Sequence, residues 1–348
     1  MLDEEHFAFA RQAGATHIVA HLTDYFNKGD HEDTTDQPVG NTKMGWGIAQ
    51  EKKIWSYEML ISLKNRIAKY DLKLEALENI SPAFWHDILL DGPLCDVQIE
   101  DIKKLVQNMG KAGIPILGYY FSLAGIAGRI RGPFARGGAV AVGMDGEPEV
   151  VETPIPRGMV WNMIYDPSLI KSGEVLETIS QQELNRRHQY FLNEILPVAE
   201  ESGVKLAMHP DDPPLKEIRK QPRLGYHPDH YKEIMKTSQN PNHMMELCLG
   251  TIAEMEGGDI YETVEHFAAR NEIGYIHFRN VRNKVPYYKE TFVDEGDIDM
   301  ARIVRILREH DYQGMIVPDH APQMSCDAPW HAGMAFSMGY IKALLQIS

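Results

Sequence analysis

With 348 residues, the chain has enough material for one large domain or two ordinary ones. Hydrophobic residues make up 43% and charged residues 24% of it, which is normal for a globular protein with a sizeable buried core. The formal net charge is −15, and lysine and arginine form no cluster. This argues against nucleic acid or an anionic membrane as the main partner, because both require a basic face.

The first half of the chain alternates between helical and strand patterns. Glycine ends the first and third helices, and Ser56 caps the second. The strand-like segments are nearly continuous runs of apolar residues, which is typical of strands buried on both faces. In chain order we predict a helix over 2–13, a strand over 16–22, a surface loop over 27–47, a helix over 56–70, a strand over 72–80, a helix over 99–112 and a strand over 114–122.

The alternation stops between 123 and 180 and then resumes. This excursion is rich first in glycine and arginine and later in proline. A loop of this length inside a compact domain is usually functional or disordered. We interpret it as a lid whose Arg129, Arg131 or Arg136 meets an acidic substrate; the alternatives are a solvated loop or a contact between subunits. After it we predict a helix over 182–202, strands ending at His209, Cys248, His277 and Asp319, and a final helix through 338–345.

Strands that alternate with helices imply parallel pairing through right-handed crossovers. We therefore predict an α/β fold, a TIM (β/α)8-type barrel formed by residues 1–348 as a single domain. The pattern contains seven strands, one fewer than a closed eightfold barrel requires. Either the first strand is missing, or the irregular segment from Val160 to Tyr165 takes its place.

Cysteine usage and the chain start bear on the compartment. The three cysteines are widely spaced and odd in number, which predicts no disulfide framework and a reducing environment. The first residues are acidic and lack an apolar signal core, and no run approaches the roughly 18–20 apolar residues that span a bilayer. We expect a cytoplasmic homo-oligomer, a dimer, with no membrane partner.

Four polar side chains each end a predicted strand: His209, Cys248, His277 and Asp319. Active sites of parallel barrels lie at the C-terminal ends of the strands. Two imidazoles, a thiolate and a carboxylate suit a borderline divalent metal such as manganese, iron, cobalt or zinc, whereas magnesium prefers oxygen ligands. Taken singly, each histidine could be a hydrogen-bonded core residue and the cysteine an inert thiol. His320, beside Asp319, could replace it as a ligand or work as a base.

Several short motifs resemble those of the mannonate dehydratase family. They are R-Q-A-G-A-T at Arg11, I-L-P-V-A-E-E at Ile195, H-P-D-D-P-P at His209, L-C-L-G-T at Cys248, H-F-R-N at His277, E-G-D-I-D-M at Glu295 and P-D-H at Asp319. The resemblance covers most of the chain except the excursion. It implies a xylose-isomerase-like barrel and a hydro-lyase that converts D-mannonate into 2-keto-3-deoxy-D-gluconate with manganese or another divalent ion. The family's metal ligands carry over to His209, Cys248, His277 and Asp319.

The chain also departs from the family pattern. Better-known members begin with a further strand, and many have P-D-H-G-H where this chain continues with Ala321 and Pro322. A tyrosine of the last loop aligns near Met334, and a histidine aligns near Val293. These differences favour a shorter, divergent branch of the family.

Dehydration of an aldonate removes a proton next to the carboxylate and expels the neighbouring hydroxyl. Arg279 could clamp the carboxylate through a bidentate fork, or form a structural salt bridge. His320 is the first candidate for general base or acid, with Asp211 or a tyrosine as its counterpart; alternatively, Asp211 caps its turn. Glu78 and Tyr120 are expected to bind substrate. The competing functions are a sugar isomerase or epimerase on the same scaffold, and a catalytically silent binding or assembly protein.

Overall fold

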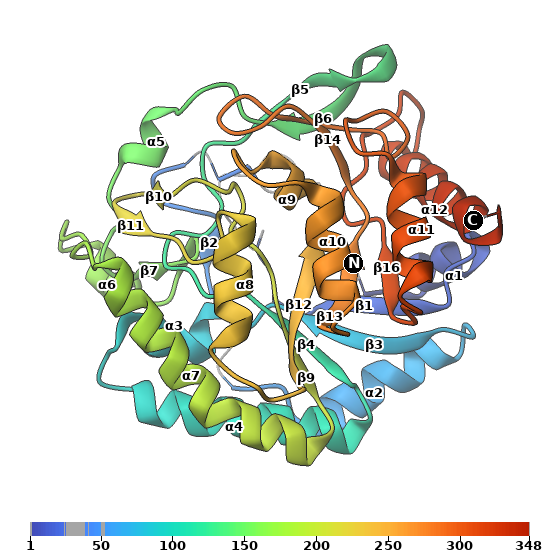
Figure 1. Ribbon diagram of the computed structural model, residues 1–348. Coiled ribbons are helices and arrows are strands. Elements are labelled where there is room, and N and C mark those ends of the chain that lie inside the picture. Colours follow the sequence, from blue (N-terminus) through green and yellow to red (C-terminus); the bar gives the residue numbers. More distant parts are fainter. Residues whose placement is uncertain (1, 24, 26–38, 41, 50–52, 348) are drawn as a thin grey trace.

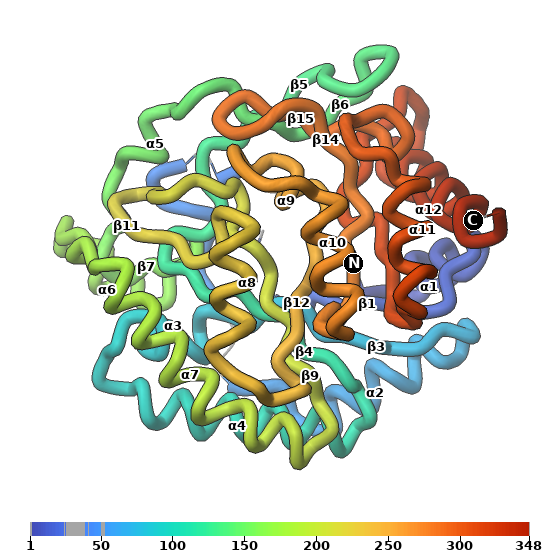
Figure 2. The backbone as a smooth tube through the Cα atoms, in the orientation of Figure 1, coloured from blue at the N-terminus to red at the C-terminus, as the bar shows by residue number. Residues whose placement is uncertain are grey.

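The computed structural model describes residues 2–23, 25, 39, 40, 42–49 and 53–347. Most of the surface loop predicted over 27–47 lies outside these residues. Figures 1 and 2 show a central barrel of strands with helices around it, and the first and last helices side by side. No helix within the described ranges combines the length and apolar character needed to span a bilayer.

Seven parallel strands form the central sheet, as the sequence predicts (Figure 1). Their spatial order follows the chain, so each strand pairs with the next one, as in a barrel wound from βα units. The sheet begins and ends at strands that do not pair with each other, and the barrel is therefore nearly closed. The strands are β1 (His17–His21), β3 (Lys73–Glu78), β4 (Ile116–Tyr119), β9 (Lys205–Met208), β12 (His243–Cys248), β13 (Ile273–His277) and β16 (Met315–Val317).

The segment from Val160 to Tyr165 does not supply an eighth strand, so that alternative is wrong. It forms β7 (Met159–Val160) and β8 (Met163–Ile164), which pair antiparallel, and β8 pairs with β2 (Gly47–Ile48) in a separate sheet. Trp161 and Asn162 between them both have positive φ, of 47° and 58°. Two such residues make a tight hairpin turn, which folds the segment back on itself.

Helices cover the outside of the barrel, and several begin and end as the sequence predicts. The Ser56 and Ser180 side chains accept hydrogen bonds from the backbone N–H of Met59 and Glu183, and Gly113 and Gly203 end their helices in the left-handed conformation. The helices are α1 (Glu4–Gln12), α2 (Tyr57–Ala68), α3 (Pro82–Leu90), α4 (Cys95–Ala112), α7 (Gln181–Ser202), α8 (Pro228–Lys236), α9 (Leu249–Glu254), α10 (Ile260–Ala268), α11 (Met300–Glu309) and α12 (Pro329–Ile347).

The excursion between 123 and 180 is folded and packs beside the strand ends. The excursion contains a hairpin of two strands, β5 (Ile130–Ala135) and β6 (Ala139–Gly143). This hairpin pairs with β14 (Asn280–Arg282) and β15 (Lys289–Thr291), which follow β13 in the chain, and the four strands form a sheet at the C-terminal end of the barrel (Figure 1). The excursion also contains a 3-10 turn (Arg136–Gly138) and the short helices α5 (Glu149–Glu152) and α6 (Pro167–Ile170). A small hairpin of β10 (Glu217–Ile218) and β11 (Gln221–Pro222) follows β9.

The strand alternation divides apolar side chains between two layers. One set packs against the helices, and a smaller set fills the barrel interior. The interior set comprises Val19, Ala76, Ile116, Ala207, Met244, Tyr275, Met315 and Val317. Two residues further along, the same face carries polar groups on every strand except β4, where Gly118 stands: His21, Glu78, His209, Glu246, His277 and Asp319. The pleat of the sheet therefore concentrates them at the C-terminal end of the interior.

Candidate metal centre and active site

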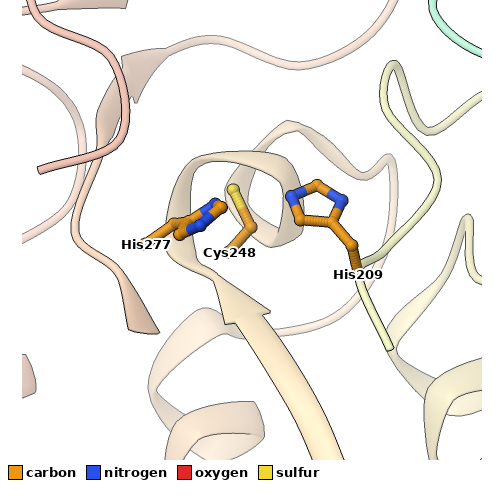
Figure 3. A group of neighbouring side chains, drawn as sticks. All are labelled: His209, Cys248 and His277. Atoms are coloured by element: carbon orange, nitrogen blue, oxygen red, sulfur yellow. The ribbon is translucent and has the colours of Figure 1, made fainter. Parts of the chain in front are cut away.

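Three of the four predicted ligands meet at this end of the barrel. One ligand atom each from His209, Cys248 and His277 lies within 4.8 Å of the other two. Figure 3 shows the Cys248 sulfur between the two imidazole rings. The residues come from three neighbouring strands: His209 directly follows β9, while Cys248 and His277 end β12 and β13. Two imidazoles and a thiolate are a donor set suited to a borderline divalent metal.

Hydrogen bonds select which nitrogen of each histidine faces the sulfur. Nδ1 of His209 lies 2.6 Å from the Pro210 carbonyl and donates to it, which leaves Nε2 for a ligand. In His277, Nε2 lies 3.2 Å from Glu78 Oε2 and 3.3 Å from Glu246 Oε1. Nδ1 of His277 is buried and has no hydrogen-bond partner in the described chain. A buried polar atom without a partner is costly, and a metal ion would satisfy it.

Cys248 lies in surroundings that favour its thiolate, the form that binds metals. It is fully buried, with Arg279 Nη2 at 3.2 Å and Thr251 Oγ1 at 3.1 Å from the sulfur. Burial alone would raise the pKa of the Cys248 thiol. The positive charge of Arg279, together with contacts from His209 and His277, outweighs this and holds the pKa well below its usual range.

The fourth predicted ligand, Asp319, stands beside this group of three. Its Oδ2 lies 3.6 Å from Nδ1 of His277 and 3.3 Å from Nε of Arg279. Asp319 has a positive φ of 61°, which turns the chain directly after β16. It therefore contacts the group through His277 and borders the same space.

Two carboxylates hold the other side of the His277 ring. Glu78, Glu246 and His277 form a second group whose ligand atoms lie within 4.8 Å of one another. Glu246 is fully buried, and burial, reinforced by the charge of Glu78, raises its pKa to about 8. The sequence reasoning missed Glu246, although alternation on β12 places it on the same face as Cys248, two residues earlier.

His320 is oriented in the way an acid–base residue requires. Its Nδ1 lies 3.0 Å from each oxygen of the buried Glu290, and its Nε2 lies 3.6 Å from Asp319 Oδ1. A carboxylate that holds one ring nitrogen fixes the tautomer and leaves the other nitrogen for proton transfer. The role of His320 as a base stays a prediction.

A cavity of about 1620 Å³ opens above the strand ends and continues between β1 and β16, toward α1 and α12. At the catalytic end its wall includes an aromatic group in which Tyr120 stacks on Trp161 at 4.0 Å and Tyr25 lies 5.1 Å from the same ring. The other lining residues at this end include His21, Glu78, Asn79, His209, Asp211, His277, Asp319 and His320.

Comparison with known proteins decides the family. The family model described as D-mannonate dehydratase (UxuA) matches residues 9–131 and 151–347. The chain belongs to the D-mannonate dehydratase family. The internal stretch that is not matched, 132–150, lies inside the excursion, where the sequence also contains no family motif. The family confirms the prediction of a hydro-lyase, and the isomerase alternative is not favoured.

Individual members of the family are distant relatives of this dehydratase. A mannonate dehydratase of Streptococcus suis (strain 05ZYH33) is 29% identical over 277 residues, covering 76% of this chain and 74% of that protein. A mannonate dehydratase of Thermotoga maritima is 26% identical over 290 residues, covering 77% and 78%.

Solved structures agree with this placement. The crystal structure of mannonate dehydratase from Streptococcus suis serotype 2 matches with a TM-score of 0.71 and 25% identity, covering 86% of this chain and 84% of that one. A D-allulose 3-epimerase from Methylomonas sp. matches with a TM-score of 0.55 at 14% identity, covering 98% and 90%. At that identity the epimerase shows the barrel fold alone.

Two other predicted site residues of the dehydratase are bound by protein groups. The Arg279 guanidinium is buried between carboxylates, with Asp212 Oδ2 at 2.9 Å, Asp319 Oδ2 at 3.3 Å and a close ion pair to Glu290. Asp211 accepts hydrogen bonds of 2.7 Å from two backbone N–H groups, and Arg223 Nε lies 2.8 Å from it. These contacts match the structural alternatives, a salt bridge for Arg279 and a turn cap for Asp211.

The predicted substrate-binding residues both line the cavity. The Tyr120 hydroxyl donates to the Ile80 carbonyl at 3.2 Å and lies 3.3 Å from the indole nitrogen of Trp85. The hydroxyl is therefore held within the protein, and the ring stacks on Trp161 in the cavity wall. Glu78 is held by the hydroxyl of Tyr275 at 3.1 Å as well as by His277.

The arginines of the excursion have different surroundings. Arg129 is fully buried, pairs with Asp212 and donates to the Tyr288 hydroxyl at 2.9 Å. Arg136 is exposed and lies 3.0 Å from Asp294. Arg131 lies in β5. Of the three, only Arg129 lines the cavity.

Proposed function

We propose that this dehydratase converts D-mannonate into 2-keto-3-deoxy-D-gluconate and water at the centre formed by His209, Cys248 and His277. The observation that carries the proposal is the buried Nδ1 of His277, which makes no hydrogen bond in the described chain, has the Asp319 carboxylate 3.6 Å away, and belongs to the same group of ligand atoms as the thiolate-favouring Cys248. Such an arrangement is unfavourable unless a cation completes it. The family match indicates that the reaction at this centre is a dehydration.

The residues fit a divalent metal, and we propose Mn²⁺, with Fe²⁺, Co²⁺ or Zn²⁺ as the other candidates. His209, Cys248 and His277 would hold it. Asp319 would be the fourth ligand, because it lies beside His277. A metal bound there would act as a Lewis acid that stabilises negative charge developing on the substrate carboxylate or 2-hydroxyl.

The side chains around the centre divide the remaining work. Nε2 of His320, with Nδ1 held by Glu290, takes the proton from the carbon next to the carboxylate. Arg279 compensates the charge of Cys248, Asp319 and Glu290 and so keeps the ligands in their ionised forms. Asp211 and Arg223 fix the loop after β9, which positions His209.

The substrate binds against the aromatic wall of the cavity. The C–H face of a sugar acid packs on aromatic rings, and Tyr120, Trp161 and Tyr25 offer such a surface. Glu78 lies in the same wall and would accept a hydrogen bond from a substrate hydroxyl. Three further proposals rest on the sequence: residues 1–348 form one domain, the enzyme is a dimer, and it is cytoplasmic.

The test is an assay of purified protein with added Mn²⁺ and a panel of C5 and C6 aldonates and uronates. Periodate oxidation followed by thiobarbiturate detects a 2-keto-3-deoxy acid and does not detect a ketose. We expect the signal with D-mannonate in the presence of metal and its loss with a chelator. A panel without any 2-keto-3-deoxy product, with each of the four metals supplied, would contradict the proposal.

A further inference from the structure

His21 occupies a position in the active site that the sequence reasoning did not assign. It ends β1, and the parallel register places it beside Glu78 at the end of β3. Val19, two residues earlier, belongs to the interior layer, so His21 points into the same end of the barrel as the metal centre. Its side chain is 46% exposed and lines the cavity.

Glu78 connects His21 to the metal centre. Nε2 of His21 lies 3.2 Å from Glu78 Oε1, while Glu78 Oε2 lies 3.2 Å from Nε2 of His277. One carboxylate therefore holds both imidazoles, one on each oxygen. With Nε2 held by Glu78 and the side chain lining the cavity, Nδ1 is the nitrogen of His21 left for a substrate.

The other acid–base groups at this end of the cavity are engaged. Asp211 is held by Arg223 and two amides, and Asp212 is held by Arg129 and Arg279. The Tyr120 hydroxyl is bonded to a carbonyl. Of the acid–base groups described at this end, His21 and His320 remain as candidates. His21 ends β1 and His320 follows β16, the two ends of the sheet, so they approach the substrate from different strands.

We propose that His21 is the general acid of the dehydration, an assignment that rests on the proposed function. His320 takes the proton from C2, and the electron pair of that C–H bond is first delocalised onto the carboxylate and then forms the C2–C3 double bond. The C3–O bond breaks, and its electron pair leaves with the oxygen. Nδ1–H of His21 gives its proton to this oxygen, so water departs and the enol that remains becomes the 2-keto acid.

The surroundings of His21 favour its protonated form. Desolvation by the surrounding protein disfavours the charged ring even though it is partly exposed, but the Glu78 carboxylate outweighs this and raises the pKa of His21 above its ordinary value. Glu246 acts in the same direction, His277 opposes it, and the ring of Tyr25 lies 6.0 Å away. An imidazolium next to a carboxylate is a suitable proton donor near neutral pH.

The test uses the variant His21→Gln and measures proton removal and hydroxyl departure separately. The glutamine amide can still donate a hydrogen bond to Glu78. We expect dehydration to fall by about 10²–10⁴-fold, the usual contribution of a general acid. Exchange of the C2 proton with ²H₂O should stay near the wild-type rate, because the base and the metal centre are intact. A 3-deoxy-3-fluoro aldonate, whose leaving group needs less protonation, should lose fluoride at nearly the wild-type rate.

Two variants serve as controls. His320→Gln should lose both exchange and dehydration. His17→Gln changes a histidine of the same strand that also lies near a glutamate, Glu75 at 3.9 Å, and should leave both rates unchanged. Metal content measured on each protein detects an effect transmitted through Glu78 and His277.

The outcomes are distinct. His21→Gln with wild-type dehydration, or with exchange, dehydration and metal lost together, would overturn the acid role and leave the function standing. Wild-type protein that neither exchanges nor dehydrates any aldonate would overturn the proposed function, and the role of His21 with it.

Discussion

Gly118→Ala tests whether the barrel interior beneath the metal centre is as tightly filled as the structure shows. Gly118 lies in β4 and pairs with Glu78 on β3. A Cβ there would lie 2.2 Å from the Tyr275 hydroxyl and 2.6 Å from Glu246 Oε2. Both side chains are fully buried, so each would have to shift within the barrel interior to accommodate the methyl group. We expect the free energy of unfolding to fall by about 1–3 kcal/mol, the usual cost of overpacking a core.

The same substitution should also reach the metal. The Tyr275 hydroxyl donates to Glu78, a carboxylate that holds the His277 ring, and Glu246 lies next to the same ring. Displacing Tyr275 and Glu246 should therefore weaken metal binding by about 10-fold or more. Urea unfolding of metal-free protein measures the stability change, and calorimetric titration with Mn²⁺ measures the affinity.

Gly339→Ala in α12 is the matched control, because a Cβ there meets nothing within 4 Å. Alanine is favoured over glycine in a helix, so this change should stabilise the protein by up to about 1 kcal/mol. A Gly118→Ala protein as stable as the wild type, with the same Mn²⁺ affinity, would refute the packing argument.

Three further predictions concern charges and ligands. Arg129→Ala should lower the free energy of unfolding in urea by about 3–5 kcal/mol, because it leaves buried carboxylates without their positive partner. Arg136→Ala breaks an exposed ion pair and should lower it by less than about 1 kcal/mol. Similar losses in the two variants would contradict the difference in burial. Glu246→Gln should lower metal affinity by about 10–100-fold in a calorimetric titration, and unchanged affinity would remove Glu246 from the account. Cys248→Ser should weaken Zn²⁺ binding far more than Mg²⁺ binding in competition experiments, and an equal effect on both would argue against a thiolate ligand.

Strand periodicity predicted the fold well because it depends on local pattern. Each of the seven strands of the sheet was predicted, and so was the C-terminal position of the polar side chains. The failure around Val160 to Tyr165 has a local cause as well. Trp161 and Asn162 both adopt positive φ, a conformation that asparagine tolerates but that a bulky tryptophan rarely adopts, so the sequence does not indicate the turn.

The candidate site was only partly predictable. His209, Cys248 and His277 end strands, and this marks them in the sequence. Glu246 and His21 follow from alternation once the inward face is known.

The partners of the predicted active-site residues could not be predicted in the same way. The carboxylates that surround Arg279 come from separate loops and from β15, and Asp211 is held by a residue twelve positions later. Such contacts depend on tertiary packing, and local sequence carries no record of them.

The central claim is that His209, Cys248 and His277 hold one divalent metal ion. Anomalous diffraction from crystals loaded with Mn²⁺ tests it most directly. The account predicts one strong peak between Nε2 of His209, Sγ of Cys248 and Nδ1 of His277, within reach of Asp319. Crystals with no peak there, and with Cys248 and His277 directed to separate places, would contradict it.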